Sequence, residues 1–388
     1  MRKVYLDNNA TTPLCPQVVK AMLPYLRTHF GNASSIHSFG REAKAAIESS
    51  REKIAKLFGC HPEEIYFTSG GTESDNLALK GVAFANRDKG RHLITSSIEH
   101  HAVLESCHFL ETQGFEVTYL PVDRSGVVSP EDLRKAIRED TVLVSIMHGN
   151  NEVGTIQPIA ELSKTARDAG VYFHSDTVQS TGKLKIDVEE IGIDLLSLSA
   201  HKLYGPKGAG AIYVRSGTRI TPLFHGGHHE RNYRAGTENV AGIVGLGAAI
   251  EICSKEIDAE YRYLMDLSIS FYERLKEKIP DILLNGDFEN RLPGTLNISF
   301  RGVEAEAVIL SLDLEGVAVA SGSACTSGSA EPSHVLKAMG VAPELARSAV
   351  RFSFGRFNSS QDVDYVLKIL PPIIERLRAM SPVESLNR

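Results

Sequence analysis

The sequence lacks several features that would assign it at once to a class of protein. None of its apolar runs approaches the roughly 20 residues of a membrane span, and the N-terminal MRKVYLDNNATTP has no apolar segment typical of a signal peptide. The net charge of −6 gives no electrostatic reason to expect binding to nucleic acid or to an anionic membrane. We therefore expect a cytoplasmic protein with no membrane partner and no direct nucleic-acid partner.

Cysteine is scarce, and its spacing excludes further classes. The five cysteines, Cys15, Cys60, Cys107, Cys253 and Cys325, are scattered, odd in number and include no C-x-x-C pair. This argues against a disulfide framework and against a structural zinc or iron–sulfur site on one local motif. The run His225 to Arg231, HGGHHER, is not an H-E-x-x-H zinc motif, so a loop near the site or at a subunit contact is the better interpretation. We predict no metal site.

One cysteine stands out by its surroundings. From Ser321 to Ser329 the chain contains only Gly, Ser, Ala and Thr besides Cys325. Such a composition packs poorly, and a mobile thiol suits a nucleophile that must deliver a group elsewhere. The alternative is an incidental exposed thiol on a loop.

The order of apolar patterns predicts an α/β fold. From Glu64 to Leu198 short strand patterns alternate with helical ones, which is typical of a mainly parallel sheet covered on both faces. Ligands of such sheets bind at the carboxyl ends of the strands. After Gly236 one long helical stretch, Val240 to about Lys278, leads into a smaller α+β unit. We place the boundary near Ile257, with a large domain of residues 15–257 and a small domain of 1–14 and 258–388 that carries Cys325.

Polar residues follow several of the predicted strands. In SLSAHKLYGPKGAG, Ser199, His201 and Lys202 lie between two apolar runs. A lysine just past a buried strand is shielded from water, which lowers its pKa and makes it a candidate nucleophile or Schiff-base lysine. Taken alone, Lys202 would more often be a surface lysine on a loop, because lysine is mostly exposed.

Two further segments suit a phosphate and a charged ring. Ser69-Gly70-Gly71-Thr72-Glu73 follows a strand and opens a helix, so its backbone N–H groups and helix dipole favour a phosphate, unless it is only a capped glycine turn. Asp176 follows another strand, where a carboxylate can hold a protonated ring nitrogen such as that of pyridoxal phosphate. Its alternative role is a helix N-cap.

Two more residues have chemistry to offer. His100 could stack on a flat cofactor or shuttle a proton, although a capping or core histidine is the commoner case. Arg351 lies among apolar residues of a predicted strand, an arrangement that suits two-pronged binding of a carboxylate, or else an edge-strand salt bridge.

Taken together these segments resemble the cysteine desulfurases of the NifS/IscS type, in class V of the pyridoxal-phosphate aminotransferases. The motifs that carry the resemblance are YLDNNATTP, TSGGTESDN, EHHAV, NNEVGTIQP, SDTVQSTGK, SAHKLYGPKG, HERNYRAGTEN, SGSACTSGS with EPSHVLKAMG, and VRFSFGRF. The resemblance implies an aspartate aminotransferase-like fold with a mainly parallel seven-stranded sheet and a smaller C-terminal domain. It also implies a pyridoxal 5'-phosphate cofactor and conversion of L-cysteine to L-alanine.

The resemblance also implies a role for each matching residue in cofactor binding. Lys202 would hold the cofactor covalently and move the Cα proton, and His100 would stack on the ring and assist. Asp176 would pair with the ring nitrogen and Gln179 with the ring oxygen. The phosphate would be bound by Gly71, Thr72, Ser199, His201 and, from the other subunit of a homodimer, Thr237.

The remaining implied roles concern the substrate and its sulfur. Asn151, which also lies at the cofactor, and Arg351 would hold the substrate carboxylate. Cys325 would take the sulfur as a persulfide and pass it to an iron–sulfur scaffold or a sulfur carrier.

Three alternative functions remain open at this point. They are a selenocysteine lyase, another class V aminotransferase, and a non-catalytic binding or scaffold protein. An aminotransferase would not need Cys325, and a selective lyase would leave L-cysteine largely unprocessed. Intact Lys202, Asp176, His100 and Cys325 argue against a scaffold that has lost turnover.

Overall fold

The central element is a seven-stranded sheet in a computed structural model that describes residues 2–321 and 332–380. Its order is β2-β8-β7-β6-β5-β3-β4, and all neighbours from β7 to β4 pair in parallel. β8 runs antiparallel to both β7 and β2. The predicted mainly parallel sheet is thereby confirmed. The strands are β2 (Ile65–Thr68), β3 (His92–Ser96), β4 (Glu116–Leu120), β5 (Thr141–Ser145), β6 (Tyr172–Asp176), β7 (Leu195–Ser199) and β8 (Gly210–Val214).

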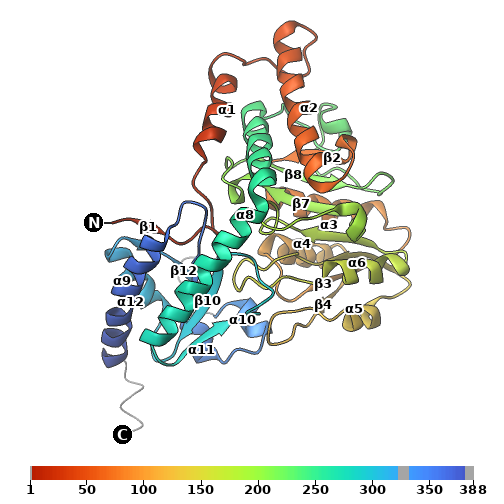
Figure 1. The fold of residues 1–388 in the computed structure, drawn as a ribbon. Coiled ribbons are helices and arrows are strands. Elements are labelled where there is room, and N and C mark those ends of the chain that lie inside the picture. Colours follow the sequence, from red (N-terminus) through yellow and green to blue (C-terminus); the bar gives the residue numbers. More distant parts are fainter. Residues whose placement is uncertain (1, 322–331, 381–388) are drawn as a thin grey trace.

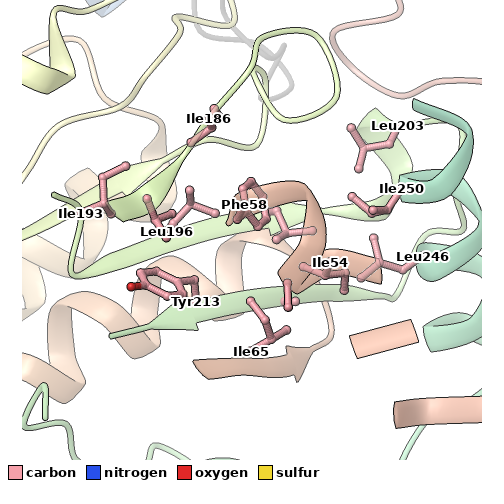
Figure 2. Packing of buried hydrophobic residues seen from close by; sticks show 14 of the residues in the cluster. Ile54, Phe58, Ile65, Ile186, Ile193, Leu196, Leu203, Tyr213, Leu246 and Ile250 are labelled. Atoms are coloured by element: carbon pink, nitrogen blue, oxygen red, sulfur yellow. The ribbon is translucent and has the colours of Figure 1, made fainter. Parts of the chain in front are cut away.

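Helices cover both faces of this sheet (Figure 1). Successive strand side chains point to opposite faces, so Leu195 packs in the cluster with α3 and α4, whereas Leu196 packs in the cluster with α2 and α8. Figure 2 shows the cluster with α2 and α8, in which Phe58 lies near Leu196 and Leu246 lies near Ile250. The helices up to β8 are α1 (Pro16–Arg27), α2 (Ser38–Phe58), α3 (Gly71–Ala85), α4 (His101–Thr112), α5 (Pro130–Ala136), α6 (Ile159–Asp168) and α7 (Val188–Ile191).

The helix α8 (Val240–Lys278) joins two separate hydrophobic cores. Its first part contributes Ile250 and Cys253 to a core packed against the large sheet. Its second part contributes Leu264 and Phe271 to the core of the smaller C-terminal unit. The predicted boundary near Ile257 falls between these parts. The division into residues 15–257 and 1–14 with 258–388 stays a prediction.

The second core belongs to a four-stranded antiparallel sheet of order β12-β13-β10-β9. Its strands are β9 (Ile282–Asn285), β10 (Thr295–Phe300), β12 (Ala320–Ser321) and β13 (Ala349–Ser353). The accompanying helices are α9 (Ala305–Leu314), α10 (His334–Ala338), α11 (Pro343–Arg347) and α12 (Ser360–Met380). The N-terminal strand β1 (Val4–Tyr5) pairs in parallel with β11 (Val317–Ala318), which brings the start of the chain to this unit. Across the described ranges no helix has the length and apolarity needed to cross a membrane.

A buried ion pair fixes the edge of the large sheet. Arg51 of α2 donates from both terminal nitrogens to the Glu230 carboxylate, at 2.9 and 2.8 Å, and each side chain is only 4% exposed. The same carboxylate accepts the N–H of Phe67 in β2 at 2.8 Å. Glu230, Arg231 and Asn232 all have positive φ, a conformation that is costly for residues other than glycine. The ion pair therefore holds a strained turn against the edge strand.

We expect Glu230→Gln to lower the free energy of unfolding by about 3 kcal/mol, because it removes the buried charge partner of Arg51 and leaves only Glu48, which is 42% exposed. Glu251→Gln is the control, since Glu251 pairs with Lys53 and Lys255 at the surface and its loss costs less than about 1 kcal/mol. Urea unfolding at fixed protein and cofactor concentration measures both. Equal small losses in the two variants would contradict the anchoring role of the pair.

Candidate active site

One cavity of about 550 Å³ collects nearly all the residues singled out in the sequence. It lies at the carboxyl ends of β6 and β7, and segments 7–10 and 319–321 close it from the side of the second core. The predicted residues that line it are Gly71, Thr72, His100, Asn151, Asp176, Gln179, Ser199, His201, Lys202 and Arg351. Cys325 lies outside the described residues. Thr237 is exposed on the loop before α8 and is not among the lining residues, so its role at a second subunit's cofactor stays a prediction.

Lys202 is placed by a short 3-10 turn, Ala200–Lys202, that follows β7 directly. Its Nζ donates to the backbone oxygens of Asn9 and of Ala10, the latter at 2.7 Å. Burial lowers its pKa to about 7, and the positive charges of Arg351 and Lys183 act in the same direction. Both acceptors are neutral carbonyls, so a large fraction of the amine is unprotonated and nucleophilic near neutral pH.

This pKa predicts a pH profile for the amine itself. In cofactor-free protein, the labelling of Lys202 by trinitrobenzenesulfonate should rise with pH up to about 7 and then level off. The sign follows from the chemistry, because only the unprotonated amine reacts and its fraction is complete above the pKa. An N-acetyl-lysine amide control should keep gaining rate to about pH 10, its ordinary pKa. Peptide mass spectrometry gives the rate, and a Lys202 profile that follows the model compound would contradict the shift.

His100 and Asp176 are two further polar residues that line this cavity. Asp176 ends β6, and its Oδ1 accepts the N–H of Val178 at 2.8 Å. Burial raises its pKa, while His100 and Lys202 oppose that shift. His100 caps α4 by accepting the Ala102 N–H on Nδ1 at 3.1 Å, so the neutral ring carries its proton on Nε2. Burial lowers the pKa of His100, which keeps it neutral. His100 is thus both a capping histidine and a residue of the cavity.

The phosphate-binding prediction corresponds to one end of the cavity. Gly71 and Thr72 form the first turn of α3, where backbone N–H groups have no partner within the helix. Ser199 lies against this turn, because a Cβ on Gly70 would come within 3.6 Å of its Oγ. His201 bonds through Nδ1 to Thr11 Oγ1 at 3.2 Å, and burial lowers its pKa to about 4, so it is neutral. The four groups together offer donors to one anion.

Arg351 also lines the cavity, and it lies on β13 of the second sheet. Its Nη1 donates to the Asn151 backbone oxygen at 3.1 Å, and its Nη2 pairs with Asp7 Oδ1 at 2.7 Å. Its buried Nε has no hydrogen-bond partner among the described residues. Arg351 therefore combines the two sequence interpretations, a salt bridge and a donor that faces a ligand cavity.

The lining residues that sequence reasoning missed include Asp7, Asn9, Ala10 and Asp75. The first three belong to the motif YLDNNATTP, which directly follows the apolar residues of β1. The sequence therefore contained a signal for Asp7 and Asn9, because polar residues that follow a strand also marked the predicted sites after the other strands. Asp75 is hidden in the helical pattern of α3, yet it is 1% exposed. Within residues 2–321 and 332–380 its Oδ1 has no hydrogen-bond partner, and His174 Nε2 lies 3.7 Å from it.

The residues present fit pyridoxal phosphate. A Cβ on Gly71 would approach Val178 Cγ2 to 2.7 Å, so only glycine leaves this part of the cavity open. The α3 turn suits the phosphate, the buried Asp176 carboxyl suits a positively charged ring nitrogen, and the Lys202 amine suits the aldehyde. Gln179, whose Nε2 donates to the Asn9 oxygen at 2.9 Å, is also within the cavity lining.

Comparison with known proteins places this arrangement in a family. The family Aminotransferase class-V matches residues 4–366. A curated relative from Dictyoglomus turgidum, named cysteine desulfurase IscS, is 58% identical over 381 residues, which cover 98% of this chain and 97% of that protein. A relative of the same name from Methanosarcina thermophila is 55% identical over 382 residues, 98% of this chain and 94% of that protein.

Solved structures agree with the sequence relatives. A NifS-like protein superposes with a TM-score of 0.91 at 40% identity, over 97% of this chain and 100% of that chain. A structure described as SspA in complex with cysteine superposes with a TM-score of 0.82 at 40% identity, over 92% of this chain and 100% of that chain. The fold and the order of the motifs are therefore shared along almost the whole chain.

Proposed function

Because the chain belongs to the cysteine desulfurases of the NifS/IscS type, within aminotransferase class V, we propose that Lys202, His100 and Cys325 carry its reaction. The protein is a pyridoxal-phosphate-dependent enzyme that removes sulfur from L-cysteine. The observation that carries the residue assignment is the placement of the Lys202 amine, with its lowered pKa, in one cavity with Asp176, His100 and Arg351.

The protein's residues divide the work by their chemistry. Bound pyridoxal phosphate supplies the electron sink that makes the substrate Cα proton acidic. Asp176 provides the carboxylate that keeps the ring nitrogen charged, and the α3 turn, Ser199 and His201 hold the phosphate. Lys202 would hold the cofactor through its amine and would move the proton at Cα, and the neutral His100 would assist this transfer. Arg351 and Asn151 hold the substrate carboxylate.

Sulfur transfer requires a second nucleophile. In our proposal the Cys325 thiolate attacks the substrate sulfur, forming a sulfur–sulfur bond as the carbon–sulfur bond breaks. The electron pair of the broken bond stays with the substrate carbon, which takes up a proton and becomes the methyl group of L-alanine. The sulfur remains on Cys325 as a persulfide until an acceptor or a reductant removes it. We propose an iron–sulfur scaffold or a sulfur-carrier protein as that acceptor.

We also propose a homodimer and a cytoplasmic location. Large apolar side chains are exposed together between α1 and the start of α2, including Phe30 at 75% and Ile36 at 92%. Such a surface is typical of an interface rather than of a solvated face. In the dimer Thr237 would reach the other subunit's cofactor. The cytoplasmic proposal rests on the free thiols of Cys15, Cys60, Cys107 and Cys253, which suit a reducing compartment.

Trapping of the persulfide tests the proposed sulfur path. The loaded enzyme receives one equivalent of L-cysteine without reductant and is then alkylated and digested. We expect an added sulfur atom on the peptide that contains Cys325, and none on the peptides with Cys60 or Cys107. Sulfur found on another cysteine would reject Cys325 as the acceptor.

A further inference from the structure

The guanidinium of Arg351 is already paired with a carboxylate from the far end of the chain. Asp7 Oδ1 lies 2.7 Å from Arg351 Nη2, although the two residues are 344 positions apart. The arginine side chain is 6% exposed and that of Asp7 is 20% exposed. Both residues line the cavity. A carboxylate of the protein therefore sits on the donor that we propose for the substrate's carboxylate.

The backbone of Asp7 is fixed more firmly than its side chain. Its carbonyl oxygen accepts the hydroxyl of Tyr5 at 3.0 Å and the N–H of Ala10 at 3.1 Å, and the residue forms an isolated bridge with Ser353. The carboxylate makes the one contact to Arg351 at the edge of a cavity. It can turn away from the arginine by rotation of its side chain while the surrounding backbone keeps its place.

Arg351 has spare capacity for a ligand on the same side. Its Nη1 donates to the Asn151 oxygen, and its buried Nε has no hydrogen-bond partner in the part of the chain that the structure describes. A guanidinium binds a carboxylate best through two parallel N–H groups. The pair Nε and Nη2 offers this geometry, but Nη2 is the atom that Asp7 occupies. A ligand carboxylate that binds in two-pronged fashion must therefore displace Asp7.

We propose that Asp7 occupies Arg351 as a placeholder for the substrate carboxylate and thereby lowers the affinity of the cavity for carboxylates. This inference rests on the proposed role of Arg351. A simple carboxylate gains only the hydrogen bonds to Arg351. Because it must first displace Asp7, its net binding free energy is small. An α-amino acid gains in addition the covalent bond of its amine with the cofactor. The competition weakens both ligands equally, so a simple carboxylate falls below the affinity needed to fill the cavity while the amino acid stays bound through its amine.

The test uses propionate, which has the carboxylate but neither the amine nor the thiol of cysteine. Asp7→Asn keeps an oxygen that can accept from Arg351 and removes the charge. We expect the loaded Asp7→Asn enzyme to bind propionate about tenfold more tightly than the wild type, as ligand-observed NMR measures, which corresponds to about 1.4 kcal/mol. The KM for L-cysteine should fall as well, whereas Asp258→Asn, which removes the surface partner of Lys185, should leave both values unchanged.

A third variant separates this inference from the assignment on which it rests. Arg351→Gln should weaken propionate binding and raise the KM for L-cysteine. If it does so but Asp7→Asn binds propionate no more tightly than the wild type, the placeholder role is wrong and Arg351 keeps its role. If Arg351→Gln leaves propionate binding unchanged, both statements are wrong. Circular dichroism of each variant confirms that the comparison is made on folded protein.

Discussion

Replacement of Lys202 by alanine should remove the covalent attachment of pyridoxal phosphate and lower kcat at least about 10³-fold, because proton transfer by such a group alone contributes about 10²–10⁴. The variant loses the amine whose pKa burial has lowered to about 7. Borohydride reduction followed by peptide mapping measures the attachment, and alanine formation from L-cysteine measures the rate. We expect no reduced cofactor on any lysine of the variant.

Lys183 is the matched control for this experiment. It is also buried, its pKa is lowered to about 8, and its Nζ lies 3.4 Å from Gln179 Oε1. Its substitution by methionine should leave the borohydride-reducible link in place. A Lys202→Ala enzyme that still carries such a link would show that Lys183 or Lys207 is the attachment site, and the assignment of Lys202 would then be wrong.

Replacement of Cys325 by alanine should abolish sulfide release and leave the cofactor's absorbance unchanged. The variant keeps every residue of the described cavity, so it should still load the cofactor and bind L-cysteine. It lacks the nucleophile to which the substrate sulfur is transferred. Methylene-blue detection of sulfide and the visible spectrum of the protein measure the two properties on the same sample.

Cys60→Ala provides the comparison for the thiol. Cys60 is the most exposed of the described cysteines, yet burial and the charge of Glu64 raise its pKa to about 12, so it is not a thiolate at neutral pH. Its replacement should leave sulfide release intact. Sustained sulfide release by Cys325→Ala would remove the persulfide role from Cys325 and would require another acceptor.

The sequence predicted much of the site because its polar residues follow buried strands. The strand predicted to end at Leu198 ends at Ser199, and the next residues form the turn that carries Lys202. Asp176 was predicted to follow a strand and is its last residue. The helix predicted from Glu73 begins at Gly71, which puts Gly71 and Thr72 in its first turn. Periodic patterns locate such features within a few residues, although they leave the boundaries uncertain.

Contacts between distant segments could not be predicted in this way. The pair of Asp7 with Arg351 depends on the pairing of β1 with β11 and on the bridge between Asp7 and Ser353 of β13. The sequence of β1 does not indicate its partner strand, because two residues are too few to form a recognisable strand pattern. Strand β9 was also missed, since its alternating burial is weak, with Leu283 exposed beside a half-buried neighbour. Asp75 was hidden because a buried carboxyl interrupts no helical period.

The most direct test of the account is the balance of products from L-cysteine. The purified, cofactor-loaded enzyme receives L-cysteine and a thiol reductant, and alanine and sulfide are quantified together over many turnovers. Equal and continuing amounts of both are the predicted result, because each sulfur that leaves the substrate is matched by one alanine. Neither product from a protein with the cofactor bound would contradict the account and favour a selenocysteine lyase or another aminotransferase, to be tested with selenocysteine and with keto acids.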